Sequence, residues 1–171
     1  VMNKVYIAAP FFNPEQLSFV KAIERLLDEW HIPYFSPRKE GIVADLKNMS
    51  DEEKFKETKR IYDANINNIY DCPMMIAVID DHDSGTMFEI GYAAKLKSQM
   101  GIGHRKIITV SNKNYGLNIM LMHAVDAHVL GVAGLTSALI SIAEEKSILT
   151  TKVISEVYKP AMKNKNVANV N

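Results

Sequence analysis

The sequence contains a single cysteine and no excess of charge of either sign. Among its 171 residues, Lys+Arg and Asp+Glu both number 20, so no net field attracts nucleic acid or an anionic membrane. Cys72 cannot form an internal disulfide and fits a reducing compartment. No apolar run approaches the roughly 20 residues that a membrane span requires, and no secretory leader precedes the first strand pattern. We therefore expect a soluble, cytoplasmic protein without nucleic-acid or membrane partners.

Several motifs that carry well-known chemistry are also missing. The five histidines show no metal-ligand spacing such as HExxH, and no GxSxG nucleophile elbow is present. The segment Ala8–Asn13, which follows the first apolar run, lacks the glycines of a dinucleotide-binding or phosphate-binding loop. These absences disfavour a metalloenzyme, a serine hydrolase and a glycine-rich nucleotide site. Cys72 is a weak candidate for a catalytic thiol, because no histidine lies near it in the sequence.

Five short apolar segments predict β-strands, and helical patterns lie between them. The expected strands cover residues 5–9, 33–37, 74–79, 106–110 and 127–130. The expected helices begin near Asn13, Ser50, Thr86, Asn118 and Leu135; the second starts at a Ser50–Glu53 capping box, and the last ends at Glu145. In the first helix, apolar residues at helical spacing should face the core: Leu17, Val20, Ile23, Leu27 and Trp30. Residues 40–49 should form a loop.

This alternation predicts an α/β fold of the flavodoxin-like, doubly wound type. The sheet would be mostly parallel, with five strands in the order 2-1-3-4-5 and helices on both faces. We expect one domain over residues 1–160 and a polar, mobile tail over residues 161–171. In this order the first and third strands are neighbours, and ligands bind beyond their carboxyl ends. The loops at residues 9–12 and 80–89 should therefore face one cleft.

Glu89 is the main candidate for chemistry in this cleft. We expect it in the first turn of a helix, where free backbone N–H groups favour an ionised carboxylate that can act as a covalent nucleophile. An alternative is that Thr86 and Glu89 form only a capping box. The neighbouring acids favour the first interpretation, since three of them precede the helix: Asp80, Asp81 and Asp83.

Carboxylates that share a cleft push their pKa values apart, so one can be ionised while another carries a proton. Asp83, nearest to the helix start, is the expected proton donor or base-orienting group. On the other side of the cleft, Phe11 and Phe12 offer aromatic faces for stacking against a flat base. Either phenylalanine could instead be a core residue.

Four segments in this order resemble the nucleoside 2-deoxyribosyltransferase family. They are Lys4–Phe12, Tyr34–Arg38, Asp83–Ala93 and Asn118–Met120. The resemblance implies transfer of 2-deoxyribose between nucleobases by double displacement, with retention of configuration and no metal or organic cofactor. The expected partners are deoxynucleoside and free nucleobase substrates. A homo-oligomer with shared sites is also implied, built from dimers, with a hexamer as one form.

The resemblance also assigns roles to individual residues. Glu89 would be the nucleophile, Asp83 would bind and help protonate the leaving base, and Tyr6 would orient Glu89. Asn118, from a neighbouring subunit, would hold the deoxyribose. The base pocket would be shaped by Phe11, Phe12 and Met120, and the catalytic segment includes Gly85.

Two departures from the family pattern leave base preference and the C-terminus open. Asn65 stands where many members have a base-contacting aspartate; Asp63 could partly substitute for it. Tyr158 is followed by a polar tail, so no active-site role is assigned to it. Two other functions remain as alternatives. One is a 2'-deoxynucleoside 5'-monophosphate N-glycosidase, which is disfavoured because the early part of the chain lacks the glycine, serine and arginine of a phosphate-binding site. The other is a non-catalytic nucleotide-binding module.

Overall fold

The structure is a computed structural model that describes residues 4–40, 46–100, 105–113 and 116–144. The predicted tail at residues 161–171 and the last part of the predicted domain lie outside the described residues. No helix in the described ranges is long and apolar enough to cross a membrane.

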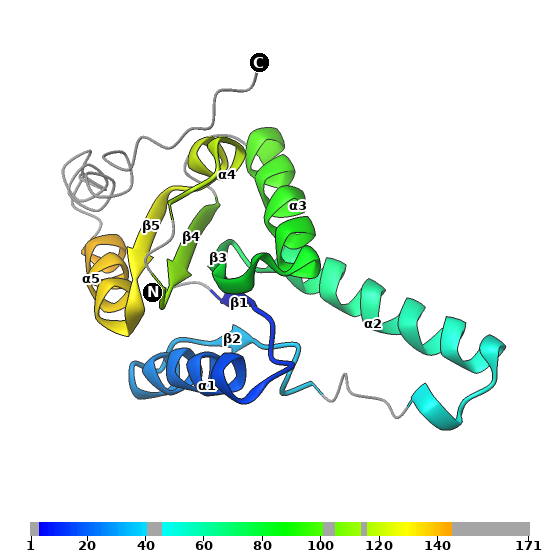
Figure 1. Ribbon diagram of the computed structural model, residues 1–171. Coiled ribbons are helices and arrows are strands. Elements are labelled where there is room, and N and C mark those ends of the chain that lie inside the picture. Colours follow the sequence, from blue (N-terminus) through cyan, green and yellow to red (C-terminus); the bar gives the residue numbers. More distant parts are fainter. Residues whose placement is uncertain (1–3, 41–45, 101–104, 114–115, 145–171) are drawn as a thin grey trace, which may run out of the picture.

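The strands form one parallel sheet in the order β2-β1-β3-β4-β5, as predicted (Figure 1). Their bounds are β1 Val5–Ala8, β2 Tyr34–Phe35, β3 Met74–Val78, β4 Lys106–Ser111 and β5 Ala127–Leu130. β2 has only two residues and lies at the sheet edge, which fits its position between two prolines.

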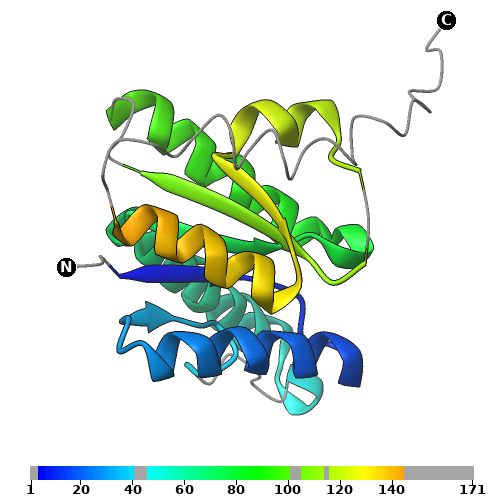
Figure 2. The same ribbon diagram turned by 90° about the vertical axis from the view of Figure 1, so that its left-hand side faces the viewer.

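The helices cover both faces of this sheet (Figure 2). Their bounds are α1 Pro14–Glu29, α2 Asp51–Asp71, α3 Ser84–Met100, α4 Ile119–Ala124 and α5 Gly131–Ala143, with short 3-10 turns η1 Leu46–Asn48 and η2 Asp80–His82. α1 and α5 pack on one face, where they enclose Val5 and Ile7 of β1. α2, α3 and α4 pack on the other, around Tyr6 and Ala8. Alternate residues of each strand therefore enter different cores, as the pleat requires.

Local start signals place two of the helices as expected. Asn13 caps α1, with Pro14 at its first position, and Ser50 and Glu53 form both bonds of a capping box at α2. Within the predicted loop at 40–49, residues Leu46–Asn48 form the turn η1.

Three sequence-based expectations about the helices are wrong. Trp30 follows the last turn of α1 and is 37% exposed, so it does not belong to the core. α5 begins at Gly131 rather than Leu135, because the left-handed φ of 61° at this glycine lets the chain turn directly from β5 into the helix. The expected end of that helix, Glu145, lies outside the described residues. α3 starts at Ser84, ahead of the expected Thr86.

Candidate active site

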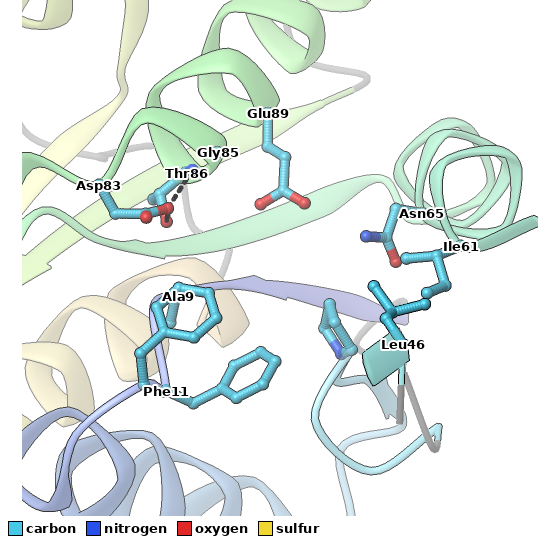
Figure 3. A pocket seen from close by; sticks show the side chains of 11 residues that line it. Ala9, Phe11, Leu46, Ile61, Asn65, Asp83, Gly85, Thr86 and Glu89 are labelled. Carbon is cyan, nitrogen blue, oxygen red and sulfur yellow. Dashed lines mark hydrogen bonds between the residues drawn. The ribbon is translucent and has the colours of Figure 1, made fainter. Parts of the chain in front are cut away.

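A cavity of about 580 Å³ opens beyond the carboxyl ends of β1 and β3. The loop after β1 contributes one wall, and the start of α3 contributes another, so the two loops predicted to share a cleft do so. The residues that line the cavity are Ala9, Phe11, Phe12, Pro37, Leu46, Ile61, Asn65, Asp83, Gly85, Thr86 and Glu89. Figure 3 shows that Asp83 and Asn65 flank Glu89 from opposite sides, with the phenylalanine loop across the cavity.

Glu89 is fixed by Tyr6, whose hydroxyl donates a hydrogen bond of 2.6 Å to Glu89 Oε1. Tyr6 is fully buried in β1 and stacks on Phe35, so its hydroxyl has a defined position. Burial raises the pKa of Tyr6 far above its ordinary value, and the nearby Glu89 carboxylate raises it further. Tyr6 is therefore a permanent hydrogen-bond donor to Glu89.

The electrostatics of Glu89 differ from the expectation for a first-turn carboxylate. Glu89 is the sixth residue of α3, beyond the turn whose N–H groups are free. Burial raises its pKa from 4.5 to about 7, while the Tyr6 hydrogen bond lowers this pKa and the Asp83 charge raises it. Glu89 thus changes its protonation state near neutral pH.

The capping interpretation of Glu89 is also wrong, because Asp83 caps the helix. Asp83 Oδ2 accepts hydrogen bonds from the Thr86 backbone N–H at 2.8 Å and from its hydroxyl at 3.0 Å. A Cβ added at Gly85 would lie 3.1 Å from the same oxygen, so glycine permits the carboxylate to sit close over the helix start. Thr86 was not predicted as part of the site, although aspartate three residues before the first free backbone N–H groups is itself a cap signal.

The three acids before α3 do not act as one group. Asp80 is buried and accepts hydrogen bonds from the Ser111 hydroxyl and from the backbone N–H groups of Asn112 and Lys113. Asp81 points to the exterior, and only Asp83 lines the cavity. Asp80 is a structural anchor between the loops after β3 and β4.

Asn65 contributes a polar group without a protein partner to the cavity wall. Its Oδ1 atom is buried and has no hydrogen-bond partner within the described part of the chain. Such atoms are rare in folded proteins, and one at a cavity wall is suited to bind a ligand donor. Asp63 does not substitute for it, because Asp63 is paired with Lys59 and is not among the lining residues. Ile61 lies one turn before Asn65 on the same helix face, a spacing from which it could have been predicted.

Phe11 and Phe12 lie with their ring centroids 5.1 Å apart at the cavity. Phe12 is 75% exposed, so it is not a core residue. Its exposed ring leaves an apolar face on which a planar group can stack.

Three predicted residues do not line this cavity: Tyr6, which reaches it through its bond to Glu89, and two residues near the start of α4. Asn118 caps α4 by accepting a hydrogen bond from the Met120 backbone N–H at 2.8 Å, and Met120 is 76% exposed. Neither is among the residues that line the cavity. Their predicted role requires a second subunit.

The described residues include neither a reactive thiol nor a cluster of metal ligands. Cys72 is buried, and this burial raises the pKa of its thiol. No group of three or more His, Cys, Asp or Glu side chains in these ranges could hold a metal ion.

The hydrogen bond from Tyr6 to Glu89 predicts how kcat/KM should depend on pH. If ionised Glu89 is the reactive form, kcat/KM of the protein should rise with pH, with a midpoint near 7. Tyr6→Phe removes the interaction that lowers the pKa of Glu89, so the midpoint should move to higher pH, with a plateau about 10-fold lower. A matched control is Tyr34→Phe, which removes a hydroxyl from the adjoining strand that is bonded to Lys39. An unchanged midpoint in Tyr6→Phe would contradict the assignment.

Comparison with known proteins found one matching family model and several similar structures. A family model described as nucleoside 2-deoxyribosyltransferase matches residues 5–122. Among solved structures, the chain resembles a 2-deoxyribosyltransferase from Bacillus psychrosaccharolyticus, with a TM-score of 0.59 and 24% identity over 73% of this chain and 84% of that one. It also resembles a conserved protein from Enterococcus faecalis V583, with a TM-score of 0.51 and 19% identity over 92% and 89% of the two chains. No curated protein sequence matches it significantly.

Proposed function

Since the chain belongs to the nucleoside 2-deoxyribosyltransferase family, which is a family of enzymes, we propose that Glu89 is the nucleophile of a double-displacement base exchange. The observation that carries this proposal is the arrangement of Tyr6 and Glu89. A buried tyrosine fixes one carboxylate oxygen, and the carboxylate points into a cavity large enough for a nucleoside.

The first step forms a bond between Glu89 and C1′ of the deoxynucleoside. The bond from C1′ to the base breaks, its electron pair leaves with the base, and a glycosyl ester on Glu89 results. Asp83, on the same wall of the cavity, holds the leaving base and supplies a proton to it when protonated. A second base then attacks C1′ and loses its N–H proton to Asp83, while the bond from C1′ to Glu89 breaks and releases the carboxylate, so two inversions give retention.

The remaining lining residues support binding of the base. Phe11 and Phe12 provide apolar surface for stacking, and the amide of Asn65 can both donate and accept a hydrogen bond. An amide cannot supply a proton near neutral pH, so Asp83 alone carries that role in this site.

A neighbouring subunit completes the site in this proposal. Asn118 and Met120 are exposed on α4, and Phe55, Tyr62 and Phe88 are exposed on α2 and α3. The rings of Tyr62 and Phe88 lie 6.2 Å apart between centroids, and neighbouring exposed aromatic side chains are suited to an interface between subunits. Asn118 of one subunit would hold the deoxyribose at the cavity of the next.

The competing hydrolase of deoxynucleoside monophosphates fits less well. A phosphate needs cations or free N–H groups, but none of the described residues that line the cavity is Lys or Arg. Ser36 and Arg38 flank the lining residue Pro37, and both are bonded to the buried carboxylate of Glu24. Asp83 already occupies the start of α3.

A chromatographic assay with thymidine or deoxyinosine, each with and without adenine, tests the proposed function. We expect deoxyadenosine only when adenine is present, and the donor that reacts defines the base preference. Release of free base at the same rate without adenine would instead indicate a hydrolase. Binding without conversion of either donor would indicate a non-catalytic nucleotide-binding module.

A further inference from the structure

The side chain of Gln16 bridges two loops that border the cavity. Gln16 is the third residue of α1, a position from which glutamine ordinarily bonds back to the N-cap backbone N–H. Here its Oε1 accepts a hydrogen bond of 2.9 Å from the backbone N–H of Phe12. Its Nε2 donates one of 3.1 Å to Asp81 Oδ2. One amide therefore joins the phenylalanine loop after β1 to the acidic turn after β3.

The acidic turn is tied at its other side to the loop after β4. Asp81 Oδ1 accepts a hydrogen bond of 3.0 Å from Lys113 Nζ. The neighbouring Asp80 binds the backbone of Asn112 and Lys113. The loops after β1, β3 and β4 are thus linked in series, with Gln16 as the connection to the first.

The turn that receives these bonds has an unfavourable backbone. Asp81 and His82 are consecutive non-glycine residues with left-handed φ angles of 63° and 50°, and they directly precede Asp83. Each such residue costs about 1 kcal/mol and needs surrounding contacts to hold it. The hydrogen bonds on Asp81 supply such contacts two residues before Asp83, which lines the cavity.

We propose that Gln16 is a positioning residue that holds the Phe11–Phe12 loop and the Asp83 turn at a fixed separation across the cavity. Neither Gln16 nor Asp81 lines the cavity, so both act through their neighbours. The nucleobase would be held between the phenylalanine loop and the start of α3. This inference rests on the proposed function, because it assigns the base to that part of the cavity.

Gln16→Ala removes both arms of the bridge and should weaken base binding. The donor nucleoside and the acceptor base occupy the same place in turn, so KM should rise about 5- to 10-fold for both, with kcat changed by less than about 2-fold. Because the lost hydrogen bonds are exposed, the unfolding midpoint should stay within about 3 °C of that of the parent protein. Ser18→Ala, at an exposed position of the same helix, is the matched control and should keep the parent KM.

A paired exchange separates this role from a general effect of altering α1. Gln16→Glu retains an acceptor for the Phe12 N–H but places a second carboxylate beside Asp81, so KM should rise. Adding Asp81→Asn supplies an amide N–H donor to the carboxylate introduced at position 16. The bridge is then restored, with the donor and the acceptor exchanged between the two side chains. Asparagine also tolerates the left-handed backbone. The double variant should recover most of the parent KM for both substrates.

Hydrogen–deuterium exchange of residues 9–13 gives a measurement that does not require activity. Faster exchange in Gln16→Ala and Gln16→Glu, with recovery in the double variant, is expected. A parent KM in Gln16→Ala, or no recovery in the double variant, would overturn the inference. If the parent protein itself does not transfer deoxyribose between bases, the proposed function fails. The hydrogen–deuterium exchange rates still decide whether Gln16 fixes the loop.

Discussion

Glu89→Gln should lower the rate of base exchange by about 1,000-fold or more, because glutamine has no carboxylate to form the glycosyl ester. The side chain keeps its size and can still accept the Tyr6 hydrogen bond. Rapid quenching of the parent enzyme with donor alone, followed by mass spectrometry, should show deoxyribose attached to the peptide that contains Glu89. The variant should show no such adduct. Near-normal exchange in the variant would remove Glu89 as the nucleophile.

Thermal unfolding of the same variant provides the control for folding. Because the pKa of Glu89 is raised to about 7 in the folded protein, the folded state binds more protons than the unfolded state between pH 4.5 and 7. The stability of the parent protein therefore falls as the pH rises through this range. Glu89→Gln lacks this loss, so its unfolding midpoint should match the parent near pH 4.5. It should exceed the parent above pH 7 by several degrees, which corresponds to about 3 kcal/mol.

This combination of lost activity and gained stability would show that the buried carboxylate is kept for chemistry. A purely structural carboxylate should destabilise the protein when it is replaced. The measurements need equal protein concentrations, since association of subunits also shifts the midpoint.

Asp83→Asn should lower kcat by about 100-fold while leaving the helix cap intact. Asparagine caps helices about as well as aspartate, so the bonds from Thr86 can be kept. It cannot transfer a proton to the leaving base, and general acid catalysis contributes about 100-fold or more. Steady-state rates and unfolding midpoints, measured together, should therefore show a large kinetic effect and a small effect on stability.

Asp83→Ala separates the two roles of this residue. Alanine removes the cap as well as the acid, which should cost a further ~1 kcal/mol of stability, or a few degrees in the unfolding midpoint. Its rate should be close to that of Asp83→Asn. If Asp83→Asn kept the parent kcat, Asp83 would be only a helix cap, and the proton would have to come from elsewhere.

Much of the fold could be predicted from local patterns. The five apolar segments are short and separated by helical periodicity, and parallel strands joined by helices allow few sheet orders. Asn13 and Ser50 marked helix starts because their side chains bond to the next turn of the backbone. Trp30 was placed wrongly because the helical spacing continued past Glu29, where α1 ends, and its side chain is 37% exposed.

The sequence by itself determined the type of sheet, the cleft at the ends of β1 and β3, and the residue types that meet there. The tertiary structure decided where the side chain of each of those residues points and which role it can have. Proximity in sequence put Asp80, Asp81 and Asp83 together, yet their side chains point to the core, the exterior and the cavity. Tyr6 tunes Glu89 across 83 residues, and burial sets the pKa of that carboxylate. Direction and desolvation are properties of packing in three dimensions, so no local pattern contains them.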